Sequence, residues 1–234
     1  MRDKAVHMVA FAPHPLDADL GIGGTVARMT QEGKEVIIVV CTNGDKGSSD
    51  PDMKPEELAQ IREQEQLVSA KMLGVTEVVF LRHPDLGLEY TPELRKEILR
   101  LILTYRPEIV ATCDPYKQYF SNPDHRVISQ TVLDAIWPCA LAPNTYRDLL
   151  EQGLQLHKVK EMLLWQTEEP NYRLDISDTF DIKKAALSCH KSQIGDPMEA
   201  EFEEILTNGA TVAAEGENYR FGEAFHRLEV LQRL

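Results

Sequence analysis

A histidine and an aspartate stand three positions apart, as His14 and Asp17, in the stretch "FAPHPLDADLGIGGT". Imidazole nitrogens and carboxylate oxygens at this spacing are typical ligands of a zinc or iron ion. A second histidine, His125, follows Asp124 in the stretch "NPDHR". Two imidazoles and one carboxylate leave a coordination position open for water, as a catalytic zinc requires, although the same set can hold ferrous iron. The pattern predicts a metal site made by His14, Asp17 and His125.

Two other interpretations of these residues compete with the metal site. The glycine-rich turn "GIGGT" could open a dinucleotide-binding helix, but Val26 stands where the last glycine of G-x-G-x-x-G would be, and the second strand ends without a ribose-binding acid. Alternatively, His14 and Asp17 could cap one helix and Asp124 another, with the histidines in solvent. The metal site is favoured only if residues distant in the sequence converge.

Alternating strands and helices are the elements that must bring these residues together. We predict strands at "AVHMVAFAP", "EVIIVVCT", "EVVFL" and "EIVATC", and helices at "GTVARMTQEG", Pro55–Leu73, Thr91–Tyr105 and Asp124–Ile136. This order, with near-continuous Val/Ile strands, predicts an α/β, Rossmann-like three-layer fold with a mostly parallel sheet and helices on both faces. Ligands in such folds bind outside the carboxyl ends of the strands, where His14, Asp17 and Asp85 all lie.

The part of the chain after Pro143 has a different pattern. The stretches "EMLLW" and "YRLDI" predict a short strand pair, and helices are expected near Asp178–His190, Pro197–Thr207 and Gly222–Leu231. With 234 residues, 43% of them hydrophobic, the chain is expected to form a single domain over residues 1–234.

The composition excludes several classes of partner. A net charge of −13 and an isoelectric point of about 5.0 disfavour binding to nucleic acid. The apolar runs are too short to span a bilayer, and the N-terminus "MRDKAV" has no signal-peptide profile. We therefore expect a soluble, cytoplasmic protein that binds neither nucleic acid nor membranes, with its four scattered cysteines reduced.

The chain resembles a known family at several motifs. "APHPLDADLGIGGT" resembles the H-P-D-D signature of the LmbE-like, or PIG-L, zinc-dependent N-deacetylases, and "NPDHRVISQTVLDA" resembles their second signature, usually H-P-D-H. The stretches "IREQEQLVSAKMLGV", "HPDLGL" and "KKAALSCHKSQ" extend the resemblance over nearly the whole chain. The resemblance implies that His14, Asp17 and His125 bind zinc, and that Arg62, Asp85 and His190 face the substrate. Arg62 also lies in the charged stretch "REQEQ", so an exposed helix face is the alternative for it.

The chain departs from the family pattern at two positions. Leu16 stands where the family has the aspartate that acts as general base, and a leucine neither accepts nor donates a proton. Asn122 replaces a histidine that, held by the aspartate matching Asp124, helps to stabilise the oxyanion. An amide can still donate a hydrogen bond to developing negative charge. Asp19 is close in sequence, but if the helix already starts at Asp17, its side chain points elsewhere.

The resemblance implies a zinc-dependent hydrolase that removes an acetyl group from an N-acetylglucosamine-type sugar or its conjugate, impaired here by Leu16. The alternative is a zinc-containing pseudoenzyme that binds an amino sugar without hydrolysis. Leu16 is either natural or an introduced inactivating change. The expected partner is a small N-acetylated sugar, and the family often forms trimers or hexamers. We expect the loop "DPYKQYFSNPDH" to form one wall of the pocket, with Tyr116, Tyr119 and Phe120 against a sugar ring.

Overall fold

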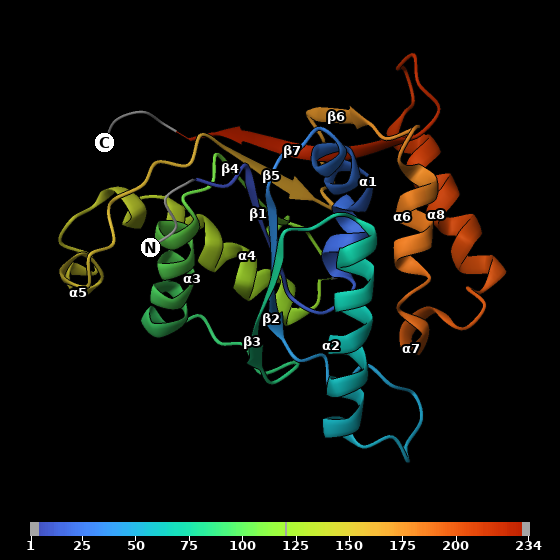
Figure 1. The fold of residues 1–234 in the computed structure, drawn as a ribbon, viewed down its shortest axis with the longest axis horizontal. Helices are drawn as coiled ribbons and strands as arrows, with labels where there is room; N and C mark the ends of the chain where they lie inside the picture. The colour runs from blue at the N-terminus through green and yellow to red at the C-terminus, as the bar shows by residue number, and fades with distance from the viewer. Residues whose placement is uncertain (1–4, 120, 231–234) are drawn as a thin grey trace.

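The computed structural model describes residues 5–119 and 121–230, so the expectation for Phe120 lies outside the described residues. A seven-stranded sheet in the order β3-β2-β1-β4-β5-β7-β6 forms the centre of the protein (Figure 1). The strands are β1 (Met8–Ala12), β2 (Val36–Thr42), β3 (Glu77–His83), β4 (Ile109–Cys113), β5 (Glu161–Trp165), β6 (Tyr172–Asp175) and β7 (Gly222–Glu229). The helices are α1 (Asp17–Gln31), α2 (Pro55–Met72), α3 (Pro92–Tyr105), α4 (Pro123–Ile136), α5 (Arg147–Glu151), α6 (Phe180–Leu187), α7 (Lys191–Ile194) and α8 (Ala200–Ala213), with a 3₁₀ turn at Cys139–Leu141.

The strands β1 to β5 are parallel, and their apolar side chains fill the interior. Every residue of β1 and β2 is buried, as expected for strands covered on both faces. Ile98 of α3 and Val132 of α4 join the core on one face, while Val26 of α1 and Ala186 of α6 join the core on the other. Figure 1 shows these helix pairs on opposite sides of the sheet. The predicted three-layer α/β fold is confirmed.

The C-terminal part of the sheet differs from the sequence-based expectation. The helix predicted near Gly222–Leu231 is wrong, because Gly222–Glu229 is the strand β7. The predicted pairing of "EMLLW" with "YRLDI" is also wrong, since β7 lies between β5 and β6 and pairs antiparallel with both. Phe225 and Leu228 have a spacing that also suits a helix. Hydrogen bonds to a strand on each side of β7 outweigh this local pattern.

The glycine-rich turn serves packing inside α1. The helix has a break at Ile22, where φ is −138° and ψ is 15°. The Glu223 carboxylate of β7 accepts hydrogen bonds from the backbone N–H of Gly24, at 2.9 Å, and of Thr25, at 2.8 Å. A Cβ atom on Gly24 would lie 2.7 Å from the Ile176 side chain, so glycine is required there. Because an internal carboxylate already occupies these amides, they are not free for the phosphate of a dinucleotide.

No helix within residues 5–119 and 121–230 has both the length and the apolar character needed to cross a bilayer.

Candidate metal centre

The candidate metal ligands meet at the point where the strand order reverses. From β1 the chain continues to β2 and β3 on one side of the sheet, whereas β4 leads to β5 on the other. Such a reversal leaves a crevice outside the carboxyl ends of the two central strands. His14 and Asp17 follow β1 directly, and His125 lies in the first turn of the helix that follows β4. The sheet topology therefore brings together residues that are far apart in the sequence.

One carboxylate oxygen lies between the two histidines. Asp17 Oδ2 is 2.9 Å from His14 Nδ1 and 3.1 Å from His125 Nε2. Ligand atoms of the three residues all lie within 4.8 Å of one another. Their side chains are 8%, 13% and 16% exposed for His14, Asp17 and His125, so the cluster is mostly enclosed but reachable from outside. Two imidazoles and a carboxylate at these separations suit a zinc ion with one open position.

The carboxylates of Asp85 and Asp124 orient the His14 ring. Its Nε2 atom lies 3.1 Å from Asp85 Oδ1 and 3.2 Å from Asp124 Oδ2, on the side of the ring opposite Asp17. Asp124 is completely buried and also accepts backbone hydrogen bonds from Leu86, at 2.7 Å, and Leu88, at 3.2 Å. Metal-binding histidines typically donate their other ring N–H to such a carboxylate. Asp124 therefore ties the loop after β3 to α4 and fixes the His14 ring.

The same contacts shift the pKa values of the ligands. Burial alone would lower the pKa of His14, but hydrogen bonds to the surrounding carboxylates, that to Asp124 first, raise it to about 11. Burial likewise opposes the shift of His125, whose pKa Asp17 raises to about 10. Burial would raise the pKa of Asp17, yet the two imidazoles hold it well below its usual range. Metal binding requires neutral imidazoles, so an ion would replace one proton on each ring and leave the other ring N–H in place.

Arg62 is buried rather than on an exposed helix face, and that alternative is wrong. Its side chain is 4% exposed and donates hydrogen bonds to the carbonyl oxygens of Gly44, at 2.8 Å, and Pro15, at 2.9 Å. Gly44 has a φ of 65°, and a Cβ atom on it would lie 2.6 Å from the guanidinium, so the loop after β2 favours glycine where it passes Arg62. Arg62 therefore connects the loops after β1 and β2. Its contact with a substrate stays a prediction, as does that of Asp85.

Leu16 lies between the ligands His14 and Asp17 in a strained backbone conformation. Leu16, with φ of 89° and ψ of −37°, occupies the third position of a β-turn in which the Asp17 N–H donates to the His14 carbonyl oxygen at 3.3 Å. A positive φ at this position favours glycine and costs about 1–3 kcal/mol for other residues. Its backbone N–H donates to Gln66 Oε1 at 2.8 Å. The side chain packs against an apolar cluster that includes Ile176 and Phe180. Position 16 is therefore part of the connection between the metal loop and the C-terminal helices.

Asp19 points away from the metal ligands, as expected for a helix that starts at Asp17. It is fully buried, and its Oδ2 atom lies 2.7 Å from His190 Nε2. Ser69 Oγ donates to the same oxygen, and Gln66 Nε2 lies 3.2 Å from both carboxylate oxygens. His190 is also fully buried, so the substrate contact expected for it stays a prediction.

Gln66 and Ser69 were missed by the sequence analysis. Both are completely buried on α2, on the same face as Arg62. The signal that could have found them is their spacing, because Arg62, Gln66 and Ser69 stand at positions i, i+4 and i+7 and therefore share one helix face. Buried polar side chains at this spacing indicate a polar partner facing the helix.

Asn122 caps α4 and thereby supports the second half of the site. Its Oδ1 atom accepts a hydrogen bond from the Asp124 backbone N–H at 2.8 Å. Because the carbonyl oxygen of the side chain makes the cap, the amide N–H₂ group is the part left to donate to a ligand. Its role at a developing oxyanion stays a prediction.

The family-like stretches on α2 and near α7 contact each other. Glu65 accepts hydrogen bonds from the Ser192 backbone N–H, at 2.8 Å, and from its hydroxyl, at 2.6 Å. Gln193 Nε2 donates to the Gly47 carbonyl oxygen at 3.1 Å. The stretch "CHKSQ" therefore holds α7 beside α2 and beside the loop after β2.

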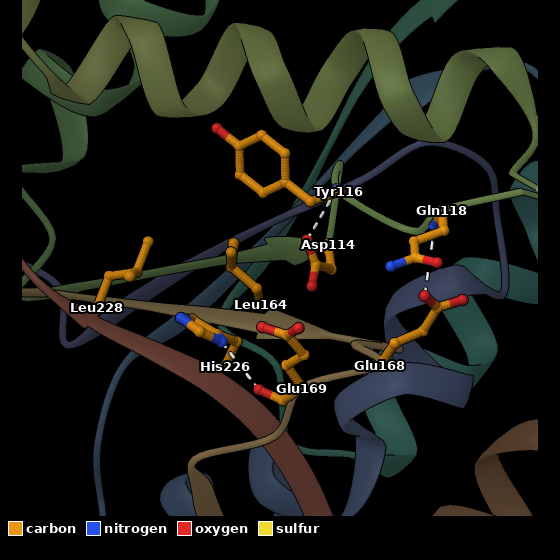
Figure 2. A pocket seen from close by; sticks show the side chains of 8 residues that line it. All are labelled: Asp114, Tyr116, Gln118, Leu164, Glu168, Glu169, His226 and Leu228. Carbon is orange, nitrogen blue, oxygen red and sulfur yellow. Dashed lines mark hydrogen bonds between the residues drawn. The ribbon is translucent and has the colours of Figure 1, made fainter.

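A second hollow lies next to the loop that follows β4. Asp114, Tyr116, Gln118, Leu164, Glu168, Glu169, His226 and Leu228 line it (Figure 2). Figure 2 shows the Asp114 and Glu169 carboxylates directed into this space, with the His226 ring at its side. Tyr116 is 65% exposed and Tyr119 is 82% exposed, so neither ring is held by the core. Their packing on a sugar stays a prediction.

Comparisons with known proteins identify similar chains. The sequence profile of PIG-L, described as GlcNAc-PI de-N-acetylase, matches residues 9–136. A diacetylchitobiose deacetylase of Thermococcus kodakarensis is 34% identical over 216 residues, which cover 92% of this chain and 80% of that protein. A 1D-myo-inositol 2-acetamido-2-deoxy-alpha-D-glucopyranoside deacetylase of a Mycobacterium species is 28% identical over 238 residues, covering 83% of this chain and 76% of that protein. The solved N,N'-diacetylchitobiose deacetylase of Pyrococcus horikoshii superposes with a TM-score of 0.91 at 32% identity, covering 97% of this chain and 85% of that chain.

Proposed function

Because the chain belongs to the PIG-L family, we propose that it is a zinc-dependent hydrolase that removes the acetyl group from an N-acetylglucosamine-type amino sugar or its conjugate. Its relatives are named as deacetylases, and the names of their substrates contain N-acetylated glucosamine units. We further propose that Leu16 slows the reaction in this chain. The trimer or hexamer expected from the resemblance belongs to the same proposal and can be tested by light scattering.

The observation that carries the proposal is the position of the Asp17 carboxylate between two imidazoles, 2.9 Å from His14 and 3.1 Å from His125. This donor set fits zinc, and the three residues would hold the ion. A bound zinc ion supplies Lewis acidity, both toward an acetyl carbonyl and toward water. The remaining chemistry belongs to the side chains around it.

This chain has leucine at the position where a general base would transfer the proton. Amide hydrolysis needs a group that accepts a proton from water and passes it to the departing amine. Leu16 cannot do this, and the nearby carboxylates of Asp19 and Asp124 are completely buried and already accept hydrogen bonds. General bases typically contribute about a hundredfold to ten-thousandfold in rate. We therefore expect slow turnover, with oxyanion stabilisation left to the Asn122 amide.

Substrate recognition is assigned to Arg62, Asp85 and His190. A hydroxyl-rich sugar suits a charged and polar lining, because such groups are left unpaired when the ligand lacks the matching hydroxyls. Asp85 is 5% exposed and lies beside the ligand His14, which supports a position at the inner end of a sugar site. Arg62 supports this pocket through the loops after β1 and β2 that it holds, and His190 through its contact with Asp19 in the first turn of α1.

A second candidate function is a zinc-containing protein that binds an amino sugar without hydrolysing it. The observation that favours it is the packing of Leu16 against the apolar cluster of the C-terminal helices. A leucine that contributes to packing there fits a protein in which position 16 has no role in proton transfer. In that case the metal would serve recognition alone.

Metal analysis combined with amine release tests the proposal. We expect about one zinc ion per chain and slow release of amine from at least one sugar in a panel of N-acetylglucosamine conjugates. Zinc and sugar binding without any amine release would favour the non-hydrolytic alternative. A protein purified with zinc available that binds none would contradict both functions.

A further inference from the structure

We propose that Gln66 is a positioning residue that locks the peptide group between the two metal ligands of the first loop. This inference rests on the proposed metal site and goes beyond it, because it assigns zinc affinity partly to a side chain that touches neither ligand. The feature that points to Gln66 is a single peptide bond, Pro15–Leu16, whose two polar groups are both bound by the same helix.

The two contacts come from residues one helical turn apart on α2. Arg62 donates to the Pro15 carbonyl oxygen at 2.9 Å, and Gln66 Oε1 accepts from the Leu16 N–H at 2.8 Å. The carbonyl and the N–H of a trans peptide point in opposite directions, so holding both fixes the orientation of the peptide plane. His14 precedes this peptide unit and Asp17 follows it. Its orientation therefore sets how the two ligands face each other.

The peptide plane needs such support because Leu16 does not favour its own conformation. A leucine with φ of 89° relaxes toward negative φ unless the surroundings hold it. Such a rotation would move Asp17 relative to His14 and would separate atoms that now lie 2.9 Å apart. A metal ion cannot replace this support, because it binds the side chains on either side of the peptide rather than the peptide itself.

A buried network keeps the Gln66 side chain in the required orientation. Its Nε2 donates to Asp19, at 3.2 Å from each carboxylate oxygen, and Asp19 is held in turn by Ser69 and His190. A carboxylate accepts and cannot donate, so the amide nitrogen must face Asp19 and the amide oxygen must face Leu16. Gln66, Asp19, Ser69 and His190 are all completely enclosed. We call these four residues the Gln66 network.

The test compares Gln66→Met with Gln60→Met in the full-length protein. Methionine has nearly the same length but makes neither hydrogen bond, and Gln60 is exposed on the same helix. We expect Gln66→Met to weaken zinc binding by about 10–100-fold, as for other groups that orient metal ligands, in competition with a chelator. In the metal-free protein, the Leu16 amide should exchange its hydrogen faster, while amides of the central strands keep their protection. Gln60→Met should change neither quantity.

Two results would overturn the proposal. One is a zinc affinity of Gln66→Met within about twofold of that of the unmodified chain, because loss of a group that orients a metal ligand typically lowers affinity by about 10–100-fold. The other is faster exchange at all core amides alike, which would show a general structural role. If Gln66→Met does not fold, Gln66→Asn replaces it, because asparagine is one methylene too short to reach both partners. The results expected for Gln66→Asn, and those that would overturn the proposal, are the same as for Gln66→Met. The variant His125→Ala separates the two proposals, because full zinc content in that variant would show that the metal site itself is wrong.

Discussion

Asp17 and Asp19 stand two residues apart at the start of α1, yet they belong to two different clusters of polar side chains. Asp17 lies between His14 and His125 in a cluster that is open on one side, and its side chain is 13% exposed. Asp19 is fully enclosed in the Gln66 network and contacts His190. An α-helix turns by about 100° per residue, so two residues along the chain point in nearly opposite directions.

The difference between the two clusters shows how one short segment can serve binding and stability at once. In the open cluster, the carboxylate and imidazole groups face one another and leave room for an ion. In the Gln66 network, the Asp19 carboxylate is the shared partner of Gln66, Ser69 and His190, and among the described residues only His190 Nδ1 has no hydrogen-bond partner in this network. A polar group without a partner is costly in the interior, so removing the shared carboxylate should destabilise the protein. We expect changes in the open cluster to alter zinc binding and loss of the Asp19 carboxylate from the enclosed cluster to alter folding, whereas Gln66 connects the enclosed cluster to the loop that carries the ligands.

The largest effect is expected from His125→Ala, which removes a ligand from the open cluster. Zinc binding in proteins supplies about 10–16 kcal/mol shared among the ligands, so losing one of three should weaken affinity by about a few hundredfold to several thousandfold. Purified His125→Ala should contain almost no zinc when measured by elemental analysis. Its free energy of unfolding without metal should change less than that of the Asp19 variant described next. A variant with full zinc content would show that His125 is not a ligand.

Asp19→Ala should break the enclosed cluster. Removing the Asp19 carboxylate leaves the buried polar groups of Gln66, Ser69 and His190 without their partner. Because each buried unpaired group costs about 1–3 kcal/mol, we expect the free energy of unfolding to fall by at least about 3 kcal/mol. Urea denaturation of the metal-free protein measures this loss. The exposed Asp178 provides the control, because Asp178→Ala should change stability by at most about 0.5 kcal/mol. Equal stabilities for the two variants would refute the difference between the clusters.

Leu16→Asp places a carboxylate at the boundary between the clusters, on the loop that carries the ligands. We expect turnover to rise by about a hundredfold or more, which is the lower end of what a general base supplies. Zinc affinity should change little, because the three ligands are unaltered. Paired kinetics of the two proteins, matched for zinc content, measure the effect on the best substrate of the panel. Equal rates would mean that another group already serves as the base and that Leu16 does not impair the reaction.

The smallest effect concerns the backbone strain at Leu16. Both Leu16→Ala and Leu16→Gly lose the apolar contacts with the C-terminal cluster, but glycine also accepts a φ of 89° without strain. Leu16→Gly should therefore be more stable than Leu16→Ala by about 1 kcal/mol. The normal order for helix interiors is the reverse, since alanine is favoured there by about 1 kcal/mol. Thermal unfolding of the two variants decides between these orders.

Local patterns predicted most of the parallel half of the fold. Runs of Val and Ile separated by helical stretches predicted the strands β1 to β4 and the helices between them. The spacing of His14 and Asp17 placed both at the end of the first strand, and the position of His125 placed it at the start of α4. The pattern failed at Gly222–Glu229, because the spacing of its apolar residues suits a helix while its backbone pairs with strands on both sides.

The sequence alone determined which side chains could bind a metal and which end of the sheet would carry them, because each of these side chains lies in the stretch of chain that follows a predicted strand. Only the tertiary structure showed that four polar side chains are buried and which partners they contact: Arg62, Gln66, Asp19 and His190. Asp19 lies in α1 and His190 directly before α7, 171 positions away, so no local pattern could pair them. Periodicity shows which face of a helix is buried, whereas the partner that this face meets depends on how distant segments pack.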